Sequence, residues 1–542
     1  MEGPLSNWQG KWQGKRKWGV AVLMAVIVAA GAYGHVKAVG EGSANQSDDI
    51  STELSKEDEA SLKKIKAAYN VDNQKAIAEE LEQKKQEDEY TADHMLVEYN
   101  PFGTNTLSLY FYFKTDDAVK VSYTVSTLEK PVGDFTQDVS DTQEYTTEHE
   151  FQLIGLVPDA HNEITITLTS ENGDVSTKNY QYDMGSILGD EELQLNSTID
   201  EEKKEALSDG LYVVLGNDDS SLDFMYYYDN AGVLRGEVPI LGYRSHRLIW
   251  GDDQMYYSIS ETKMAAVNRL GQVTNVYDTG DYELHHDYVF DDNGNILILA
   301  TDTTQDSVED IIIRLDADSG EVQEVLDLGD LLGDYKNTCV KNSDDELDWM
   351  HINAIQWMGK DSVLLSSRET STIIKVTDIY DNPQIEYMLG DDSFWADTKY
   401  EELLYQKKGD FTIQGGQHSI TYVKDDSLEE GQYYLYMFNN NNGVSETQPD
   451  FDWTSAGLSN GADNSYYYKY LVDENAGTFQ LADSFKVPYS GYVSSVQELD
   501  GNVIVDSGVK GVFQEYDENH DMIAEFKMSA ESFIYRVYKY QF

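Results

Sequence analysis

The chain has 542 residues, more than one small domain usually holds, so two or three domains are expected. Its 99 acidic and 39 basic residues give a formal net charge of −60, which repels nucleic-acid phosphates and argues against a DNA or RNA partner. The single cysteine, Cys339, excludes an intramolecular disulfide and a cysteine-based zinc site.

Segment 1–39 joins a basic stretch to an apolar one. Basic residues up to Lys17 precede an uncharged run over 18–34 that is about long enough to span a bilayer. The basic flank is expected to stay in the cytoplasm, so the segment is an uncleaved anchor or a secretory signal peptide. We favour the anchor, because Val36-Lys37-Ala38 is a poor cleavage site. The expected location is the cell membrane, with one span and the rest outside, or the exterior if the segment is removed.

Segment 40–92 is acidic and rich in Glu, Asp, Lys and Gln. Leu62, Ile65 and Tyr69 form a weak helical stripe, but the segment has too little apolar surface for its own core. We therefore expect a partly helical, solvated linker between the membrane and the rest of the protein.

Residues 93–184 show short alternating strands, at 107–113, 119–125 and 163–169. A hairpin turn over 171–174 precedes another strand. This pattern predicts a small β-sandwich of general immunoglobulin-like architecture with a structural role.

Residues 185–542 are almost entirely short strands separated by turn signals. The strands group into units of roughly 40–75 residues, the size of a four-stranded propeller blade with insertions. The six units begin near Gly210, His246, His286, His351, His418 and Val493. The expected fold is thus all-β: a six-bladed β-propeller after an immunoglobulin-like β-sandwich, with an N-terminal membrane or signal helix and a helical linker.

The residues that could bind a ligand or take part in catalysis lie at the starts of these units. His351 and Asn353 share one side of a strand, because side chains alternate with period 2, and a turn at 359–361 brings Arg368 back toward them. In a propeller the innermost strands line one channel, so His285 or His286, His351 and His418 would meet there. Whether His246 also points into the channel or is simply packed stays open.

These groups suit a bound tetrahedral oxyanion such as sulfate or phosphate. Imidazole, carboxamide and guanidinium groups neutralise charge on the oxygens while one neutral imidazole attacks. Three histidines could instead bind zinc, but Arg368 would sit beside the cation and no acidic ligand has metal-site spacing with them, so no metal is expected.

No nucleotide cofactor is expected either. The chain contains no GxxxxGK loop and no dinucleotide fingerprint, and we expect no other cofactor. Acidic turns at 291–295 and 316–320 lack the Glu of the EF-hand pattern and are explained as hairpin turns, which leaves a structural calcium ion open.

Segments 100–107 and 149–158 resemble the N-terminal β-domain of the bacterial arylsulfate sulfotransferases, and several later motifs resemble that family's propeller motifs. The resemblance covers about residues 94–542. These motifs are His285-His286-Asp287, Asp348-Trp349-Met350-His351-Ile352-Asn353, Ser366-Ser367-Arg368, Gly416-Gln417-His418-Ser419 and Tyr535-Arg536-Val537-Tyr538.

The resemblance implies a nucleotide-independent ping-pong transfer of a sulfuryl group from an aryl sulfate donor to a phenolic acceptor through a sulfohistidine. It also implies roles for single residues. The residue that becomes sulfated is His418, the sulfuryl oxygens are bound by His351, Asn353 and Arg368, the remaining channel histidine is His286 in preference to His285, and a last-blade hydroxyl comes from Ser494 or Ser495. Family members can pair, so a homodimer is one expected state.

Two other functions stay open at this point. One is a non-catalytic propeller that binds sulfated or anionic ligands, and the other is a hydrolytic sulfatase. The absence of a Cys-x-Pro-x-Arg motif argues against the sulfatase.

Overall fold

The structure is a computed structural model that describes residues 55–139, 144–216, 222–251, 253–530 and 532–542. The segment expected to be a membrane anchor or signal peptide, 1–39, lies outside these residues, as does the first part of the linker. Within the described ranges, no helix is both long enough and apolar enough to cross a bilayer.

Two helices occupy most of the linker, α2 (Lys56–Ala68) and α3 (Val71–Glu87). Each begins at a capping side chain: Ser55 accepts a hydrogen bond from the amide of Asp58, and Asn70 accepts one from the amide of Asn73. The expected partial helicity is therefore present.

The linker differs from the expected solvated spacer, because its few apolar side chains are buried. Ile65, Tyr69 and Leu81 are all buried. Gln74, also fully buried, donates to the carbonyl of Phe102 and accepts from the amide of Val273, so α3 is docked on a later part of the chain. The segment has too little apolar surface for its own core, and its few apolar side chains pack instead against the hydrophobic clusters of neighbouring strands.

The next strands form one hydrogen-bonded sheet of six. It is organised around β2, which pairs with β1, β3, β4 and β5, while β6 pairs with β5. The strands expected at 107–113 and 119–125 are one long strand with a register shift between Lys114 and Val119. The bounds are β1 (Leu96–Tyr99), β2 (Ser108–Ser126), β3 (Phe135–Asp138), β4 (Thr146–Ile154), β5 (Ala160–Ser170) and β6 (Val175–Met184).

Six further sheets of four or five strands follow within the described residues. The first has the order β10-β9-β8-β32, the second β11 to β14, the third β15 to β18 and the fourth β19 to β22. The fifth has the order β23-β27-β26-β25-β24 and the sixth β28-β29-β30-β31-β7. The first and sixth sheets each combine strands from the beginning and the end of this region, because β32 pairs with β8 and β7 pairs with β31.

The strands of the first three sheets are β8 (Leu211–Leu215), β9 (Phe224–Tyr228), β10 (Leu234–Pro239), β32 (Arg536–Tyr540), β11 (Ile249–Gly251), β12 (Gln254–Ser260), β13 (Lys263–Asn268), β14 (Val273–Asp278), β15 (Tyr282–Phe290), β16 (Ile296–Asp302), β17 (Ile311–Leu315) and β18 (Val322–Asp327). Those of the last three are β19 (Ile352–Gly359), β20 (Ser362–Ser367), β21 (Thr372–Thr377), β22 (Gln384–Leu389), β23 (Gln406–Lys408), β24 (His418–Val423), β25 (Gln432–Asn439), β26 (Asn464–Asp473), β27 (Thr478–Pro488), β28 (Ser495–Leu499), β29 (Asn502–Ser507), β30 (Val512–Tyr516), β31 (Met522–Lys527) and β7 (Asn196–Ile199). The connections carry the short helices α4 (Leu328–Lys336) and α5 (Asp392–Trp395).

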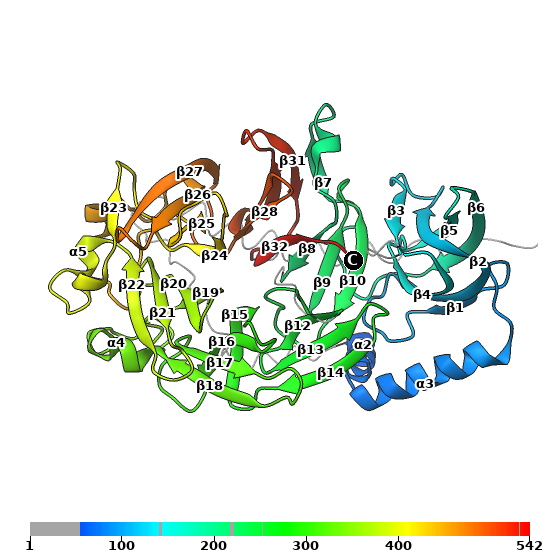
Figure 1. Cartoon of the computed structure of the whole chain (residues 1–542), viewed down its shortest axis with the longest axis horizontal. Helices are drawn as coiled ribbons and strands as arrows, with labels where there is room; N and C mark the ends of the chain where they lie inside the picture. Colours follow the sequence, from blue (N-terminus) through cyan, green and yellow to red (C-terminus); the bar gives the residue numbers. More distant parts are fainter. Residues whose placement is uncertain (1–54, 140–143, 217–221, 252, 531) are drawn as a thin grey trace, which may run out of the picture. The chain divides into compact units, whose positions relative to one another are not determined.

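Five strands that each end a sheet, β15, β19, β24, β28 and β32, contact one another in succession, and we call them the inner strands. Figure 1 shows their labels gathered together, with β18, β22 and β27 on the outer side. Side-chain hydrogen bonds join neighbouring inner strands. The Ser419 hydroxyl accepts from the amide of Val496 at 3.3 Å, and the Ser495 hydroxyl accepts from the amide of Val537 at 3.0 Å. The ends of inner strands that are far apart in the sequence are therefore held side by side.

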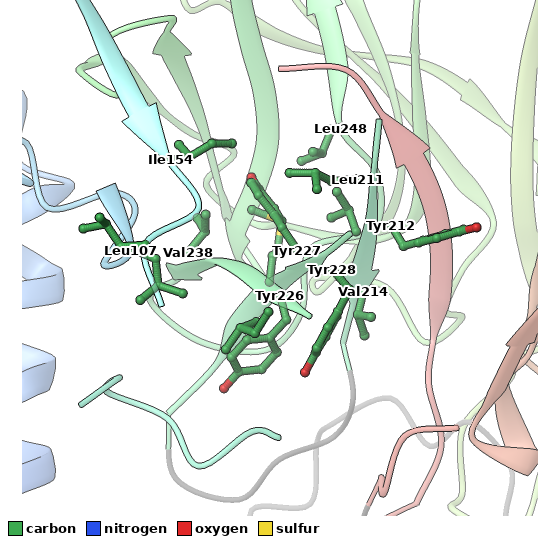
Figure 2. Close-up of a cluster of buried hydrophobic side chains, with 14 of the residues drawn as sticks. Leu107, Ile154, Leu211, Tyr212, Val214, Tyr226, Tyr227, Tyr228, Val238 and Leu248 are labelled. Carbon is green, nitrogen blue, oxygen red and sulfur yellow. The ribbon is translucent and has the colours of Figure 1, made fainter. Parts of the chain in front are cut away.

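The main hydrophobic cluster continues from the N-terminal sheet into the first of the six sheets. Figure 2 shows Leu107 and Ile154 near Val238, with three consecutive tyrosines of β9 beside them. The amide of Thr106 also donates to the carbonyl of Glu237 at 2.9 Å. The heavy use of tyrosine in the sequence is thus partly a feature of the core.

Candidate active site

Three inner strands contain a register shift in their first half. In β15, Leu284 pairs with Ala300 but Tyr288 pairs with Ile298, so residues 285–287 bulge out of the ladder. The register also shifts after Ile352 in β19 and after His418 in β24. Residues in or beside these bulges have left-handed backbones, with φ of +51° at His286, +47° at His351 and +54° at Ser419. Such conformations cost about 1–3 kcal/mol each in a residue other than glycine and cluster at functional sites.

His351 is buried between two carboxylates. Its Nδ1 lies 2.5 Å from Oδ2 of Asp348 and 2.7 Å from Oε2 of Glu309. Burial and then the Arg368 charge lower the pKa of this imidazole, but Asp348 and Glu309 outweigh both, so the pKa of His351 is raised well above its ordinary value. His351 is therefore an imidazolium at neutral pH.

His285 and His286 lie beside this group. Their Nδ1 atoms are 3.0 Å apart, and the ring of His286 lies 4.7 Å from the ring of His351 and 6.0 Å from the ring of Tyr535. Burial, followed by the charge of His286, lowers the pKa of His285 well below its ordinary value. His285 is thus neutral, and His286 is the one in ring contact with His351.

Arg368 follows directly on β20. Its amide donates to the carbonyl of His351 at 3.2 Å, and its Nη2 lies 3.6 Å from Oδ2 of Asp348 and 3.1 Å from Oε1 of Glu369. The other oxygen of Glu369 accepts from the Ser445 hydroxyl at 2.9 Å and from the amides of Glu446 and Thr447 at 2.7 and 3.1 Å. The guanidinium is therefore fixed from both sides, beside the imidazolium of His351.

His418 begins β24 and is fully buried. Its Nδ1 lies 3.0 Å from the carbonyl of Gly416 and 2.9 Å from Oδ1 of Asn440. Gly416 has φ of +59°, and a Cβ there would lie 3.9 Å from Cγ of Arg368. The turn that carries His418 therefore passes directly beside the Arg368 side chain.

Asn353, on β19, is hydrogen-bonded to residues at the starts of β24 and β32. Its Nδ2 donates to the carbonyl of Gln417 at 2.9 Å, and its own carbonyl accepts from Nη2 of Arg536 at 2.7 Å. Arg536 also lies 3.4 Å from Oδ1 of Asp287. The closing strand β32 thus holds the bulges of β15 and β19 in place.

Ser494 and Ser495 both use their hydroxyls in hydrogen bonds within the protein. Ser494 donates to the Ser490 hydroxyl at 2.9 Å and accepts from the amide of Gly508 at 3.0 Å, while Ser495 donates to the carbonyl of Val537 at 2.8 Å. Ser495 thus joins the sixth sheet to β32 of the first, and Ser494 joins the connections before β28 and after β29. A direct part of either serine in substrate binding stays a prediction.

Residues 196–538 match the family model "Arylsulfotransferase (ASST)", and residues 96–185 match "Arylsulfotransferase Ig-like domain". The chain belongs to the arylsulfotransferase family. It is accordingly a sulfotransferase with an immunoglobulin-like N-terminal domain, and its family implies small aryl donors and acceptors. The resemblance expected from the histidine and arginine motifs is confirmed.

Solved structures resemble this arylsulfotransferase only weakly. The solved structures of apo AztD from Citrobacter koseri, the C-terminal WD40 domain of Sif2 and a nidogen/laminin complex are 9%, 10% and 12% identical, with TM-scores of 0.27, 0.29 and 0.34. The matches cover 78%, 63% and 60% of this chain and 98%, 75% and 97% of those chains. Scores this low carry no argument. No curated protein matches the chain.

The arylsulfotransferase site also contains groups that the sequence did not single out. Asp348 lies in the motif Asp348–Asn353, three residues before its side-chain partner His351. Glu309 comes from the connection before β17, and Asn440 and Glu369 follow strands of the fifth and fourth sheets. Nothing in their local sequence marks them, because their positions depend on how the sheets meet.

His246, whose place was left open, also lies in this arylsulfotransferase neighbourhood. Its ring is 5.6 Å from the ring of Tyr535, and its Nδ1 lies 3.1 Å from the Ser258 hydroxyl. Burial and then the charge of His286 lower the pKa of His246 well below its ordinary value. It is a neutral, packed histidine at the edge of the group.

Two sets of side chains could hold a cation in the arylsulfotransferase site. Ligand atoms of His285, His286 and Glu309 all lie within 4.8 Å of one another, as do those of Glu309, Asp348 and His351. The guanidinium of Arg368 lies 3.6 Å from Oδ2 of Asp348, so a metal ion held by the second set would lie beside a fixed positive charge.

Proposed function

We propose that this chain transfers a sulfuryl group from an aryl sulfate to a phenol without a nucleotide, through a sulfated His418. The observation that carries the proposal is a contrast between side chains of the site. Nδ1 of His418 contacts two uncharged oxygens, whereas His351 and Arg368 are cations. An anionic sulfate is attracted by two fixed positive charges, and an uncharged imidazole beside them can attack its sulfur.

In the first half-reaction, the Nε2 lone pair of His418 forms a bond to sulfur while the bond from sulfur to the aryl oxygen breaks. The electron pair of that bond leaves on the phenolate oxygen. His351 is protonated and engages the carboxylates through Nδ1, so its Nε2 proton is the one available to the phenolate. Arg368, the second amide hydrogen of Asn353 and His286 bind the sulfuryl oxygens.

The second half-reaction reverses these bonds. The acceptor hydroxyl attacks sulfur, its proton passes to the imidazole of His351 that was left neutral, and the electron pair of the N–S bond returns to Nε2 of His418. Product release restores the starting charge on both histidines, which is what a ping-pong cycle requires.

We also propose how the rest of the chain supports this activity. The strand order of the six sheets, and the succession of contacts between inner strands, support a six-bladed propeller over 185–542 after the N-terminal domain over 93–184. An N-terminal anchor in 1–39, followed by the linker 40–92, would place the site outside the cell, and a homodimer is one state of the protein there.

The test is transfer from p-nitrophenyl sulfate to phenol. Release of p-nitrophenolate that needs phenol, together with intact protein that gains one sulfuryl group when donor is supplied alone, supports the proposal. His418→Ala should abolish both while leaving the circular dichroism spectrum that of the folded β-protein. Release without acceptor would indicate a sulfatase, and donor binding without release would indicate a non-catalytic binding protein.

A further inference from the structure

The two histidines on β24 and at the start of β19 differ in the groups that their Nδ1 atoms contact. The Nδ1 of His351 contacts two carboxylates. The Nδ1 of His418 contacts two uncharged oxygens, one from a peptide and one from the side chain of Asn440. The same ring atom is thus held by charged acceptors in one residue and by neutral acceptors in the other.

The orientation of the Asn440 amide is fixed by its other contacts. Its Nδ2 donates to the carbonyl of Ser490 at 2.9 Å and to the carbonyl of Val493 at 3.1 Å. Carbonyl oxygens only accept, so the nitrogen must lie on that side and Oδ1 must face His418. Both partners of the His418 Nδ1 are then acceptors, and this nitrogen carries the proton.

We propose that Asn440 is a positioning residue that holds His418 as the neutral imidazole protonated on Nδ1, and that an uncharged amide stands here because a carboxylate would turn the nucleophile into an imidazolium. The inference rests on the proposed function for the role of His418 as the sulfuryl acceptor. It assigns Asn440 a part that the sequence did not indicate.

The geometry suits the chemical step as well as the resting state. When Nε2 of His418 bonds to sulfur and the aryl oxygen leaves with its electron pair, the ring gains a positive charge and keeps its proton on Nδ1. Both oxygens already point at that proton, so they stabilise the charge as it develops and no proton has to leave. A carboxylate in the same place would instead favour the charged ring before the reaction begins.

The surroundings hold Asn440 in place. It is fully buried, and its carbonyl accepts from the Ser465 hydroxyl at 3.0 Å. The preceding Asn439 accepts from the amide of Gly415 at 2.9 Å, which joins this turn to the one that carries His418. These contacts hold the backbone of Asn440, while Ser490, Val493 and His418 hold its side-chain amide, so the amide does not rotate to offer its nitrogen to the imidazole.

The charge of His418 also depends on the groups that face β24 from neighbouring elements. These groups stay the same when Asn440 alone is changed. A difference in pH profile between the native protein and the Asn440 variant therefore comes from the group that contacts Nδ1 of His418. These groups are His351 and Asp348 before β19, Arg368 and Glu369 after β20, Glu446 in the connection after β25, and Arg536 and Tyr538 on β32.

The first test is the pH profile of transfer by Asn440→Asp, which is nearly the same shape as the native residue. The acid limb of kcat should move upward by about 1–3 pH units, because the carboxylate raises the pKa of His418, and activity lost at neutral pH should return at higher pH. Asn441→Asp is the matched control: its Nδ2 donates to the carbonyl of Asn464 and away from His418, so its acid limb should stay in place. An unmoved acid limb in folded Asn440→Asp overturns the inference.

The second test does not depend on activity. Long-range 1H–15N spectra of protein labelled with 15N-histidine should show His418 protonated on Nδ1, with the resonance assigned by its loss in His418→Gln. Protonation on Nε2 in the native protein would overturn the inference even if Asn440→Asp failed to fold. If the native protein performs no transfer but keeps this tautomer, the proposed function fails and the positioning by Asn440 stands.

Discussion

Oδ2 of Asp348 lies 2.5 Å from Nδ1 of His351, three residues later in the chain. The pair is buried, and it stands beside the Arg368 guanidinium. Because a carboxylate stabilises the imidazolium most strongly in a poorly solvated site, this contact keeps a proton on His351 at a pH where free histidine would have lost it.

Asp348→Asn should therefore move the alkaline limb of transfer to lower pH. The raised pKa of His351 means that its proton is present at neutral pH and is lost only as the pH rises through that raised value. Without the carboxylate the loss occurs earlier, and we expect a decrease of about 10²-fold in kcat above neutral pH, the contribution of a general acid. Asp344→Asn, an exposed residue nearby, should leave the pH profile of kcat unchanged.

Removal of metal ions should leave the activity intact. Arg368 already contacts Asp348, a carboxylate of the second candidate set, so we expect the same kcat after dialysis against EDTA as before. The measurement is transfer by EDTA-treated protein with and without added Zn²⁺, Mn²⁺ or Mg²⁺. A loss that one of these ions restores would identify the cluster as a metal centre.

Gln74→Ala should destabilise the protein without changing its chemistry. The change removes hydrogen bonds to the carbonyls of Ala68 and Phe102 and from the amide of Val273, all buried. Leaving such groups unsatisfied costs about 1–3 kcal/mol in the free energy of unfolding, which urea denaturation can measure. Gln83→Ala on the exposed side of α3 is the control and should change it by less than about 0.5 kcal/mol. Equal effects would mean that α3 is not docked as described.

Asp506 gives a stability prediction that depends on pH. It is fully buried, neither carboxylate oxygen has a hydrogen-bond partner among the described residues, and burial raises its pKa well above the ordinary value. The folded state therefore holds this proton more tightly than the unfolded state, so its contribution to stability decreases as the pH rises above the unfolded pKa of about 3.9.

Asp506→Asn removes this titration. As the pH rises from 4 to 7, the variant should gain stability relative to the native protein by about 1.4 kcal/mol for each pH unit over which Asp506 stays protonated in the folded state, in urea unfolding at a series of pH values. Asp500→Asn, in an exposed turn of the same sheet, should show no such trend. If the free energies of unfolding of the native protein and the variant changed in parallel with pH, Asp506 would be ionised in the folded protein.

The parts of the site that follow from strand periodicity could be predicted from the sequence. The tight turn between β19 and β20 brings the strand start that carries His351 and Asn353 back beside Arg368. Their proximity follows from this chain reversal and from the alternation of side chains along a strand. The meeting of His286, His351 and His418 required the assumption that the units share one centre, which the contacts between inner strands support.

The acceptors of these side chains could not be predicted in the same way. Glu309 and Asn440 stand in connections, Glu309 itself with φ of +58°, and their side-chain directions depend on bulges that no local pattern marks. The docking of α2 and α3 was missed for a related reason: a weak apolar stripe is enough when Tyr69 and Gln74 find partners on β10 and β14.

The pairing of β32 with β8 has a consequence for biosynthesis. Arg536, the first residue of β32, supplies the contacts to Asn353 and Asp287 that hold the bulges of β19 and β15. A nascent chain therefore cannot complete its reaction centre until β32 has left the ribosome and paired with β8. Truncation before Arg536, by an early stop codon or by proteolysis, would remove these contacts and with them catalysis, while most of the β-structure could still be made.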